Sequence, residues 1–283
     1  MPTLRTLLVL GRVSNLPTVW SNCLAGWWLG GGGNFSRLPF LFAGVTLLYG
    51  GGMFLNDAFD ADFDQQHRKE RPIPSGAISL QLVWRWGFAL LLLGNALLFA
   101  AGLTAGIVGA VLALNILLYD AIHKAVAFSP IIMGSCRLWV YVIAAATGVA
   151  GVTGYALWGG VALGAYVVGL SFVARCESLR GRPPYWPIPL FAVPMLLALL
   201  LNAGAYRESA ALLALVPTLW ILRSLRAAYF SGVPSVGRTV SALLAGIVLV
   251  DWLAAVNSPR ELGAAFVGLF LAALLFQRYV PAT

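Results

Sequence analysis

The chain has 283 residues, of which 60% are hydrophobic and 10% are charged, and its mean hydropathy is +0.86. This composition excludes a soluble globular protein and indicates a polytopic membrane protein. The net charge of +8 does not indicate a nucleic-acid partner, because the basic residues lie in short loops between apolar runs, where they set membrane orientation. We therefore expect a single integral-membrane domain over residues 1–283.

Ten apolar segments follow one another along the chain, and each is expected to form a helix. The expected fold is therefore an all-α, polytopic transmembrane helix bundle. The segments cover about residues 14–31, 39–57, 80–101, 104–119, 129–150, 157–176, 187–203, 209–228, 238–256 and 261–278.

The basic residues between these segments predict the orientation of the bundle. With the N-terminus inside, the inner segments hold fourteen Lys and Arg residues, and the outer loops hold only Arg37, Arg207 and Arg260. Cytoplasmic loops of membrane proteins carry such an excess of basic residues. We therefore expect a multi-pass protein of the cell membrane, the inner membrane if the organism is bacterial, with a cytoplasmic N-terminus.

The most polar stretch, residues 56–76, directly follows the second apolar segment. It contains four of the six aspartates in the chain. If the helix continues past the apolar run, Asp57, Asp60 and Asp64 lie on one face and Asp62 points elsewhere. Like charges at a membrane boundary need cations between or beside them. The stretch is on the cytoplasmic side of the predicted topology.

These oxygen ligands predict a magnesium site formed by Asn56, Asp57, Asp60 and Asp64. Mg²⁺ prefers such ligands and commonly bridges a protein to a substrate phosphate. The basic side chains that follow, at residues 68–71, are placed to bind phosphate oxygens, and two prolines restrict the loop after them. The alternative is an ordinary solvated loop whose mixed charges only end the helix.

The pattern NDxxDxxxD at residues 56–64, followed by RPxPSG at residues 71–76, resembles the first signature of the UbiA superfamily of membrane prenyltransferases. The stretches GRVSNLPTVWSNCLAG, MGSCRLWVY and ARCE are similar to a subgroup called EboC. The resemblance implies nine family helices, here with a probable tenth. It also implies Mg²⁺-dependent transfer of a prenyl group from a prenyl diphosphate to an aromatic or other small acceptor within the membrane.

The resemblance also implies roles for individual residues. Asp57, Asp60, Asp64 and Lys124 would be catalytic. The residues expected to bind substrate are Arg12, Asn15, Arg68, Arg71, Tyr119, Arg137, Arg175 and Arg180. Arg137 lies inside an apolar run, where a cation requires a partner or a polar cavity. Asp251 raises the same question, and we expect either a structural partner on another helix or a helix end at the membrane boundary.

The second family signature, DxxxDxxxG, is incomplete. The corresponding residues 173–181 are VARCESLRG, so Val173 replaces the first carboxylate and Glu177 stands at the second. Glu177 is the remaining expected metal ligand of this segment, and the neighbouring arginines can neutralise part of a diphosphate charge. Two hypotheses follow: an active transferase, or a non-catalytic protein that binds or helps transport a lipid or precursor. The acceptor, the prenyl length and the oligomeric state are left open by the sequence.

Overall fold

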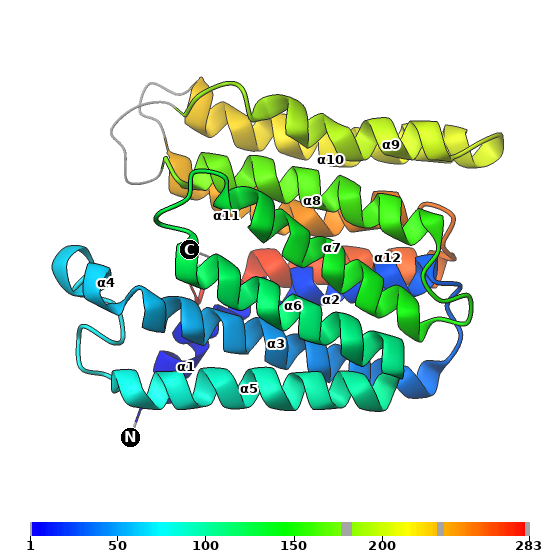
Figure 1. Ribbon diagram of the computed structural model, residues 1–283. Coiled ribbons are helices and arrows are strands. Elements are labelled where there is room, and N and C mark those ends of the chain that lie inside the picture. Colours follow the sequence, from blue (N-terminus) through cyan, green and yellow to red (C-terminus); the bar gives the residue numbers. More distant parts are fainter. Residues whose placement is uncertain (1, 177–182, 231–234, 281–283) are drawn as a thin grey trace.

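A computed structural model describes residues 2–176, 183–230 and 235–280. Its regular secondary structure in these ranges is entirely helical, with twelve α-helices and three short 3-10 helices (Figure 1). The expected all-α membrane bundle is therefore confirmed.

The α-helices are α1 (Leu4–Leu10), α2 (Leu16–Leu29), α3 (Leu38–Phe59), α4 (Ala61–His67), α5 (Leu80–Ala101), α6 (Leu103–Ile122), α7 (Ser129–Thr147), α8 (Gly154–Ala174), α9 (Val193–Leu201), α10 (Ala205–Tyr229), α11 (Val236–Ala254) and α12 (Arg260–Phe276). The 3-10 helices are η1 (Val13–Asn15), η2 (Phe35–Arg37) and η3 (Ile188–Ala192).

Each of the ten expected apolar segments overlaps one α-helix, in order α2, α3 and α5 to α12, with ends that differ by a few residues. Seven helices of the described chain are long and apolar enough to cross a membrane. The expected helix over 187–203 is divided into η3 and α9, with Pro194 at the start of α9. Proline has no N–H to continue the hydrogen bonding of the preceding helix. The short helix α1 was not expected from the sequence, and α4 continues the helical path past the second apolar run that the sequence analysis considered.

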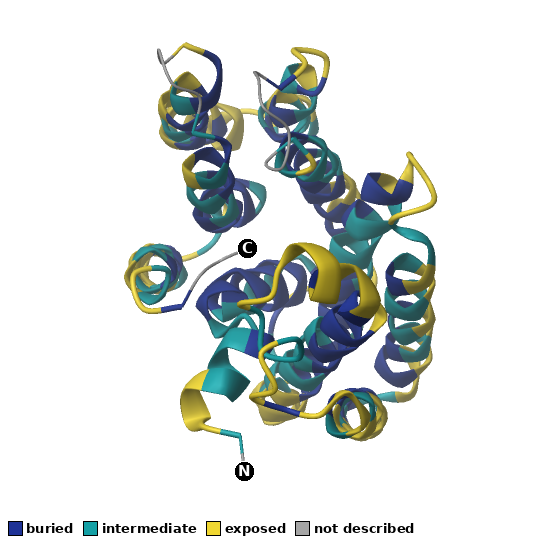
Figure 2. Cartoon of the chain, turned by 90° about the vertical axis from the view of Figure 1, so that its left-hand side faces the viewer, coloured by how far each residue is buried: buried dark blue, intermediate teal, exposed yellow. Residues whose placement is uncertain are grey.

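The long helices lie side by side, and α4 projects from one end of the bundle (Figure 1). Helix α2 lies in the interior and contacts α3, α7, α11 and α12. Figure 2 looks at the end that carries α4 and shows buried residues on the inward sides of the helices. We call this the inner end, because it carries the stretch that the sequence places on the cytoplasmic side.

Helix α3 packs closely against α5 through glycines. A Cβ atom at Gly44 would lie 2.9 Å from the carbonyl oxygen of Gly94, and one at Gly51 would lie 2.9 Å from the carbonyl oxygen of Gly87. Small residues allow membrane helices to approach in this way. This packing fixes the helix that leads into the acidic stretch.

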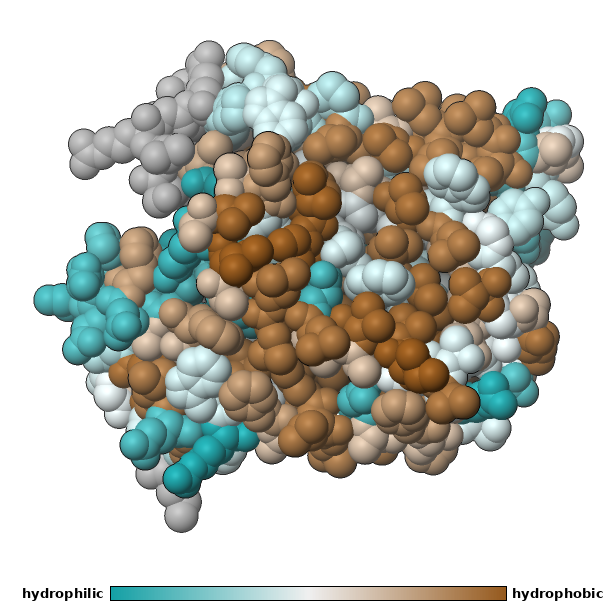
Figure 3. All heavy atoms as spheres, viewed as in Figure 1, coloured by the Kyte–Doolittle hydropathy of each residue, from teal (hydrophilic) through white to brown (hydrophobic). Residues whose placement is uncertain are grey.

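The outer surface of the bundle is apolar. Hydrophobic residues dominate the middle of the face in Figure 3, and hydrophilic residues gather around α4 at its left end. Leu92, Leu114 and Leu212 are 73%, 67% and 70% exposed. Large exposed apolar surfaces on long apolar helices are expected where the solvent is lipid. The protein is an integral, multi-pass membrane protein.

Candidate active site at the inner end of the bundle

The carboxylates of the first signature share one face, as expected from their spacing. The backbone remains nearly helical from α3 into α4, because the Asp60 N–H donates to Asn56 O (3.0 Å) and the Asp64 N–H donates to Asp60 O (2.9 Å). Asp57, Asp60 and Asp64 are buried, with exposed fractions of 6%, 8% and 1%, whereas Asp62 is exposed.

Two of these carboxylates share one arginine. Arg71 Nη1 lies 3.1 Å from Asp57 Oδ1 and 3.0 Å from Asp64 Oδ2. The turn after Arg71 is closed by a hydrogen bond from the Ser75 N–H to Arg71 O, at 3.0 Å. Because its two prolines restrict this turn, Arg71 has a defined place between the two carboxylates.

The remaining carboxylate, Asp60, is paired with two residues from the inner end of α6. Lys124 Nζ and His123 Nε2 lie 2.7 Å and 3.3 Å from Asp60 Oδ1. Lys124 Nζ also lies 4.3 Å from the centre of the Phe63 ring, a cation–π contact. The acidic stretch and the end of α6 are thus joined at Asp60.

These contacts oppose the effects of burial on both partners. Burial by itself raises the pKa of Asp60, but the hydrogen bonds from His123 and Lys124 hold that pKa below its ordinary value. Burial lowers the pKa of His123, and the bond to Asp60 outweighs it and raises that pKa. His123 Nδ1 also lies 3.1 Å from the carbonyl oxygen of Asp120. Both ring nitrogens therefore face oxygen acceptors, which favours the doubly protonated ring.

Arg12 and Asn15 reach the site from the corner between α1 and α2. Arg12 has a left-handed backbone, with φ at 41°, which turns the chain out of α1. Its Nη2 lies 3.5 Å from Asp57 Oδ1 and 3.4 Å from Asn56 Oδ1. Asn15 is buried at the start of α2, and it lines the same cavity at the inner end as Arg12 does.

Asp120, which the sequence interpretation missed, lies beside Asn56. It is buried at the inner end of α6, and its Oδ1 accepts a hydrogen bond of 3.0 Å from Asn56 Nδ2. Its other oxygen is buried without a hydrogen-bond partner. The cost of a carboxylate at a membrane boundary could have identified Asp120 as functional. Its pairing with Asn56 depends on the packing of α3 against α6.

A cavity of about 340 Å³ opens among these groups. The expected site residues that line it in the described chain are Arg12, Asn15, Asn56, Asp60, Arg68, Arg71, Tyr119, Lys124, Arg137 and Arg175. Asp57 and Asp64 lie beside it through their contacts with Arg71. Arg68 is exposed at its rim.

A smaller apolar cavity of about 80 Å³ adjoins the first. The two cavities share Tyr49, Met53, Tyr119, Met133 and Arg137. The remaining walls of the apolar cavity come mainly from α3, α6 and α7, and include valine, leucine and isoleucine side chains. A polar mouth thus leads into an apolar interior.

Arg137 has partners on α2, as its position in an apolar run requires. Its Nη1 donates to Asn22 Oδ1 at 2.6 Å, and its Nη2 donates to Thr18 Oγ1 at 3.3 Å. Asn22 Nδ2 in turn donates to Asp251 Oδ2 at 2.6 Å. Asn22 therefore links the guanidinium on α7 to the carboxylate on α11.

Asp251 is completely buried, and its expected structural partners lie on two other helices. Ser21 Oγ donates to Asp251 Oδ2 at 2.5 Å, and Tyr141 OH donates to Asp251 Oδ1 at 2.6 Å. Both carboxylate oxygens are therefore hydrogen-bonded within the bundle. The interpretation of Asp251 as a structural residue is confirmed.

The second-signature segment is only partly described. Glu177 and Arg180, expected as a metal ligand and a diphosphate ligand, lie outside the described residues. Arg175 lines the cavity, but its guanidinium is engaged by backbone carbonyls at the corner between α6 and α7. Its expected direct contact with a diphosphate stays a prediction.

The donor set fits Mg²⁺ as part of a metal–diphosphate complex. Within residues 2–176, 183–230 and 235–280, no cluster of three or more His, Cys, Asp and Glu side chains is arranged to hold a metal by itself. However, Asp64 Oδ1 is buried without a hydrogen-bond partner. Mg²⁺ is usually held by one or two carboxylates, with waters and substrate phosphates completing its shell. The carboxylates present meet that requirement.

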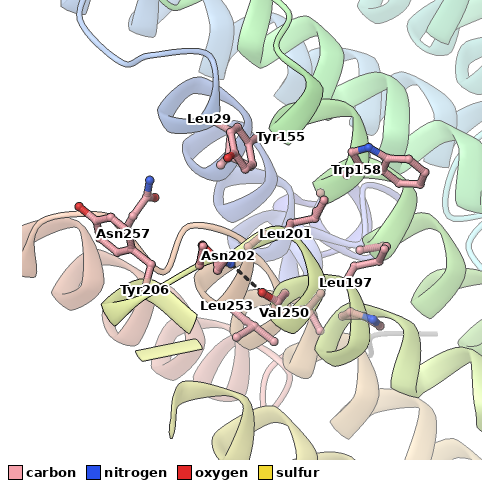
Figure 4. Close-up of a pocket in the computed structure, with 16 residues that line it drawn as sticks. Leu29, Tyr155, Trp158, Leu197, Leu201, Asn202, Tyr206, Val250, Leu253 and Asn257 are labelled. Carbon is pink, nitrogen blue, oxygen red and sulfur yellow. Dashed lines mark hydrogen bonds between the residues drawn. The ribbon is translucent and has the colours of Figure 1, made fainter. Parts of the chain in front are cut away.

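Another cavity lies at the opposite end of the bundle (Figure 4). It measures about 280 Å³ and is formed mainly by α8, α9 and α11. Its polar lining residues are Asn202, Asn257, Tyr155, Tyr206 and Trp158, and none of the described residues around it is charged. The residues that line this cavity therefore differ from those of the inner cavity, which include several arginines and Lys124.

Curated relatives match parts of the chain. A digeranylgeranylglyceryl phosphate synthase of Methanoregula boonei is 44% identical over 89 residues, covering 31% of this chain and 32% of the relative. One of Ignicoccus hospitalis is 36% identical over 115 residues, covering 41% of this chain and 37% of the relative. The matched stretches thus span about a third of each relative.

Solved structures share the fold. A UbiA homolog from Archaeoglobus fulgidus, bound to GPP and Mg²⁺, has a TM-score of 0.65 at 14% identity over 96% of this chain and 99% of that chain. The apo structure of a UbiA homolog from Aeropyrum pernix K1 has a TM-score of 0.65 at 18% identity, over 85% of this chain and 97% of that chain. At these identities the likeness concerns the fold alone.

The family model covers nearly the whole bundle. The model of the UbiA prenyltransferase family matches residues 16–280, from the start of α2 to the residues that follow α12. The match includes the acidic stretch, the apolar cavity and the Asp251 network. The chain belongs to the UbiA prenyltransferase family.

Proposed function

We propose that this protein is a Mg²⁺-dependent prenyltransferase. It takes the prenyl group from a prenyl diphosphate at the inner end of the bundle and transfers it to an acceptor within the membrane. The observation that carries the proposal is the set of Asp57, Asp60 and Asp64, three buried carboxylates on one face, each paired with a basic side chain, at a mouth that leads into an apolar cavity. A mouth of this kind suits a ligand with an anionic head and a hydrocarbon tail.

Diphosphate binding would redistribute the charges of the site. Without ligand, Arg71 and Lys124 neutralise the carboxylates. With a metal–diphosphate complex, Asp57, Asp60 and Asp64, with Asn56, would hold Mg²⁺. The basic side chains would then be available to donate to phosphate oxygens. Charge-assisted hydrogen bonds of this kind are strong and directional for arginine.

The proposed reaction exchanges a proton of the acceptor for the prenyl group. The allylic C–O bond breaks, and its electron pair leaves with the diphosphate. The acceptor forms a bond to the prenyl carbon, and its own bond to hydrogen breaks, with the proton passing to the released diphosphate or to water. Bound Mg²⁺ supplies charge neutralisation to the leaving oxygens. Arg12, Arg71 and Lys124 stabilise the developing diphosphate charge from the protein side.

The apolar cavity would hold the prenyl chain and exclude water from the allylic carbon. Tyr49 and Tyr119 lie where the polar mouth meets this cavity, because they line both. Their electron-rich rings can stabilise positive charge on the allylic carbon. The basic residues at this end also support a cytoplasmic mouth, by the excess of Lys and Arg in cytoplasmic loops.

The acceptor class can be identified by an experiment that offers two candidate classes. The curated relatives are digeranylgeranylglyceryl phosphate synthases, which makes a prenylated glyceryl phosphate a candidate acceptor beside the aromatic compounds indicated by the sequence. Both classes should be offered to the purified protein, with each prenyl diphosphate in turn.

The proposal is tested by the release of diphosphate from geranyl, farnesyl and geranylgeranyl diphosphate in detergent, with Mg²⁺ and with a chelator. We expect release that requires Mg²⁺ and is accelerated by an acceptor. Saturable binding of the same diphosphates without release would instead support the non-catalytic alternative, a protein that binds or helps transport a lipid or precursor.

A further inference from the structure

The corner between α6 and α7, residues 123–129, carries both side chains that contact Asp60. His123 and Lys124 follow directly after the last residue of α6, and α7 begins at Ser129. The last carbonyl groups of α6 accept hydrogen bonds from the corner itself, because the His123 N–H donates to Tyr119 O at 2.8 Å and the Ala125 and Val126 N–H groups donate to Ile122 O at 3.0 Å. The carbonyl groups that follow α6, at residues 123–127, need other donors. How these later carbonyls are satisfied helps to decide how firmly His123 and Lys124 are held.

Arg175, at the C-terminal cap of α8, supplies the donors. Its Nη1 lies 2.6 Å from Ala127 O, and its Nη2 lies 2.8 Å from His123 O and 3.0 Å from Val126 O. The same Nη2 lies 2.7 Å from Ser129 Oγ. A cation is also favoured near the C-terminal end of a helix. One guanidinium thus contacts three backbone carbonyls and one hydroxyl of the corner.

The corner also has hydrogen bonds of its own, because the Ala125 and Val126 N–H groups both donate to Ile122 O at 3.0 Å. Ser129 Oγ donates to His123 O at 3.2 Å, beside the guanidinium. From His123 and Lys124 the side chains extend to Asp60 Oδ1, at 3.3 Å and 2.7 Å. A continuous series of contacts therefore leads from α8, through the backbone of the corner, to the acidic stretch.

We propose that Arg175 is a positioning residue, which holds His123 and Lys124 against Asp60 by clamping the corner between α6 and α7. The inference rests on the proposed function for its catalytic consequence, and it assigns Arg175 a different role from the direct diphosphate ligand expected from the sequence. Its guanidinium fork is what the site requires, because several carbonyls must be satisfied at once. A lysine keeps the charge but cannot present a planar fork.

Kinetics of Arg175→Lys and Arg175→Gln separate the two roles. A positioning residue predicts that both variants lower kcat about tenfold or more, because small misplacements of a reacting group are costly. A direct ligand predicts that Arg175→Lys retains most of the kcat and mainly changes KM. The matched control is Arg85→Lys, at an exposed arginine of α5 outside the site, which should behave as the wild type.

A double-mutant cycle with Lys124→Ala gives the sharper test. If Arg175 acts through Lys124, the loss in the double variant falls at least about threefold short of the product of the two single losses. Losses that multiply would overturn the proposal, because Arg175 would then act on the substrate independently of the corner.

Hydrogen exchange tests the clamp without any reaction. In detergent, Arg175→Gln and Arg175→Lys should increase amide exchange in residues 123–129, leaving exchange in α3 and the thermal unfolding temperature close to those of Arg85→Lys. Unchanged exchange in the corner would contradict the clamp. If the wild type releases no diphosphate, the proposed transferase activity fails, while this measurement still decides the structural role of Arg175.

Discussion

Two polar clusters lie within this hydrophobic bundle, and they are built differently. In the interior, Asp251 is fully buried and both of its oxygens accept hydrogen bonds from short side chains or from Tyr141. At the mouth, Asp57, Asp60 and Asp64 are paired mainly with the ends of long basic side chains. The Asp251 cluster has all of its partners within the bundle. The carboxylates at the mouth have basic partners that can move to a bound anion.

The difference distinguishes a cluster that stabilises the fold from a cluster that can bind a ligand. A buried charge whose partners are short and fixed stabilises one packing of helices and leaves no place for a ligand. Carboxylates that are neutralised by Arg71 and Lys124 can give up those cations to a phosphate. Asp64 Oδ1 and Asp120 Oδ2 add buried oxygens without partners at the mouth. Mutations at the mouth should therefore affect catalysis, whereas mutations in the Asp251 cluster should affect stability.

Replacing Arg71 should have the largest effect on catalysis among the basic residues of the mouth. Arg71→Ala removes two charge-assisted contacts, each worth about 1.5–3 kcal/mol, and leaves Asp57 and Asp64 to repel each other. We expect kcat/KM for the prenyl diphosphate to fall about a hundredfold. Arg71→Lys should recover part of this loss. Steady-state kinetics in detergent measure both variants. A near-normal kcat/KM in Arg71→Ala would contradict the proposal that Arg71 moves from the carboxylates to the diphosphate.

Replacing Asp251 should affect stability instead. Asp251→Asn presents donor hydrogens to Ser21 or Asn22 and removes the negative charge that Asn22 links to Arg137. We expect a loss of about 3 kcal/mol in the free energy of unfolding, as when one partner of a buried ionic network is removed. Denaturant unfolding in detergent measures it. In Asp251→Asn combined with Arg137→Gln, the loss should be smaller than the sum of the single losses, and strict additivity would contradict the link through Asn22.

The close packing that fixes the acidic helix should tolerate no added methyl group. Gly44→Ala places a Cβ 2.9 Å from Gly94 O and from Leu98 Cδ2. We expect it to destabilise the bundle by about 1–3 kcal/mol, the usual cost of overpacking. Gly50→Ala is the matched control on the same helix, since its nearest atom would be 4.0 Å away. Equal unfolding temperatures of the two variants would contradict the role assigned to the α3–α5 contact.

The rim of the mouth should contribute least. Arg68 lines the cavity but is exposed, and an exposed ionic contact is worth about 0.2–1 kcal/mol. We expect Arg68→Ala to raise KM for the prenyl diphosphate by about threefold with kcat unchanged. The effect should shrink as the salt concentration rises, since salt screens exposed charges. A loss comparable to that of Arg71→Ala would instead group Arg68 with Arg71 and Lys124, the cations proposed to move from the carboxylates to the diphosphate.

The sequence predicts what depends on spacing along one element. Asp57, Asp60 and Asp64 are three and four residues apart, so their common face follows from helical geometry, and the exposed Asp62 follows from the same geometry. The apolar segments predict the long helices because length and hydropathy suffice for them. The existence of α1 and α4 as separate helices does not follow, since each has only seven residues.

The sequence cannot predict contacts between elements that are distant in the chain. The hydrogen bond between Asn56 and Asp120 depends on how α3 lies against α6. Arg175 contacts backbone carbonyl groups. Every residue has such a group, so no pattern of residue types identifies them in the sequence. His123 and Asp120 were therefore not placed in the site, and the backbone contacts of Arg175 were not expected.

The central claim is that the buried acidic face, rather than acidic charge in general, binds and activates a prenyl diphosphate. The most direct measurement compares diphosphate release by Asp60→Asn and Asp62→Asn, two variants that differ by two positions in the same stretch. With Mg²⁺ and substrate at saturation, we predict that Asp60→Asn loses at least about a hundredfold in rate, as expected when transition-state charge is no longer stabilised. Asp62→Asn should keep the wild-type rate. Equal rates for the two variants would contradict the account.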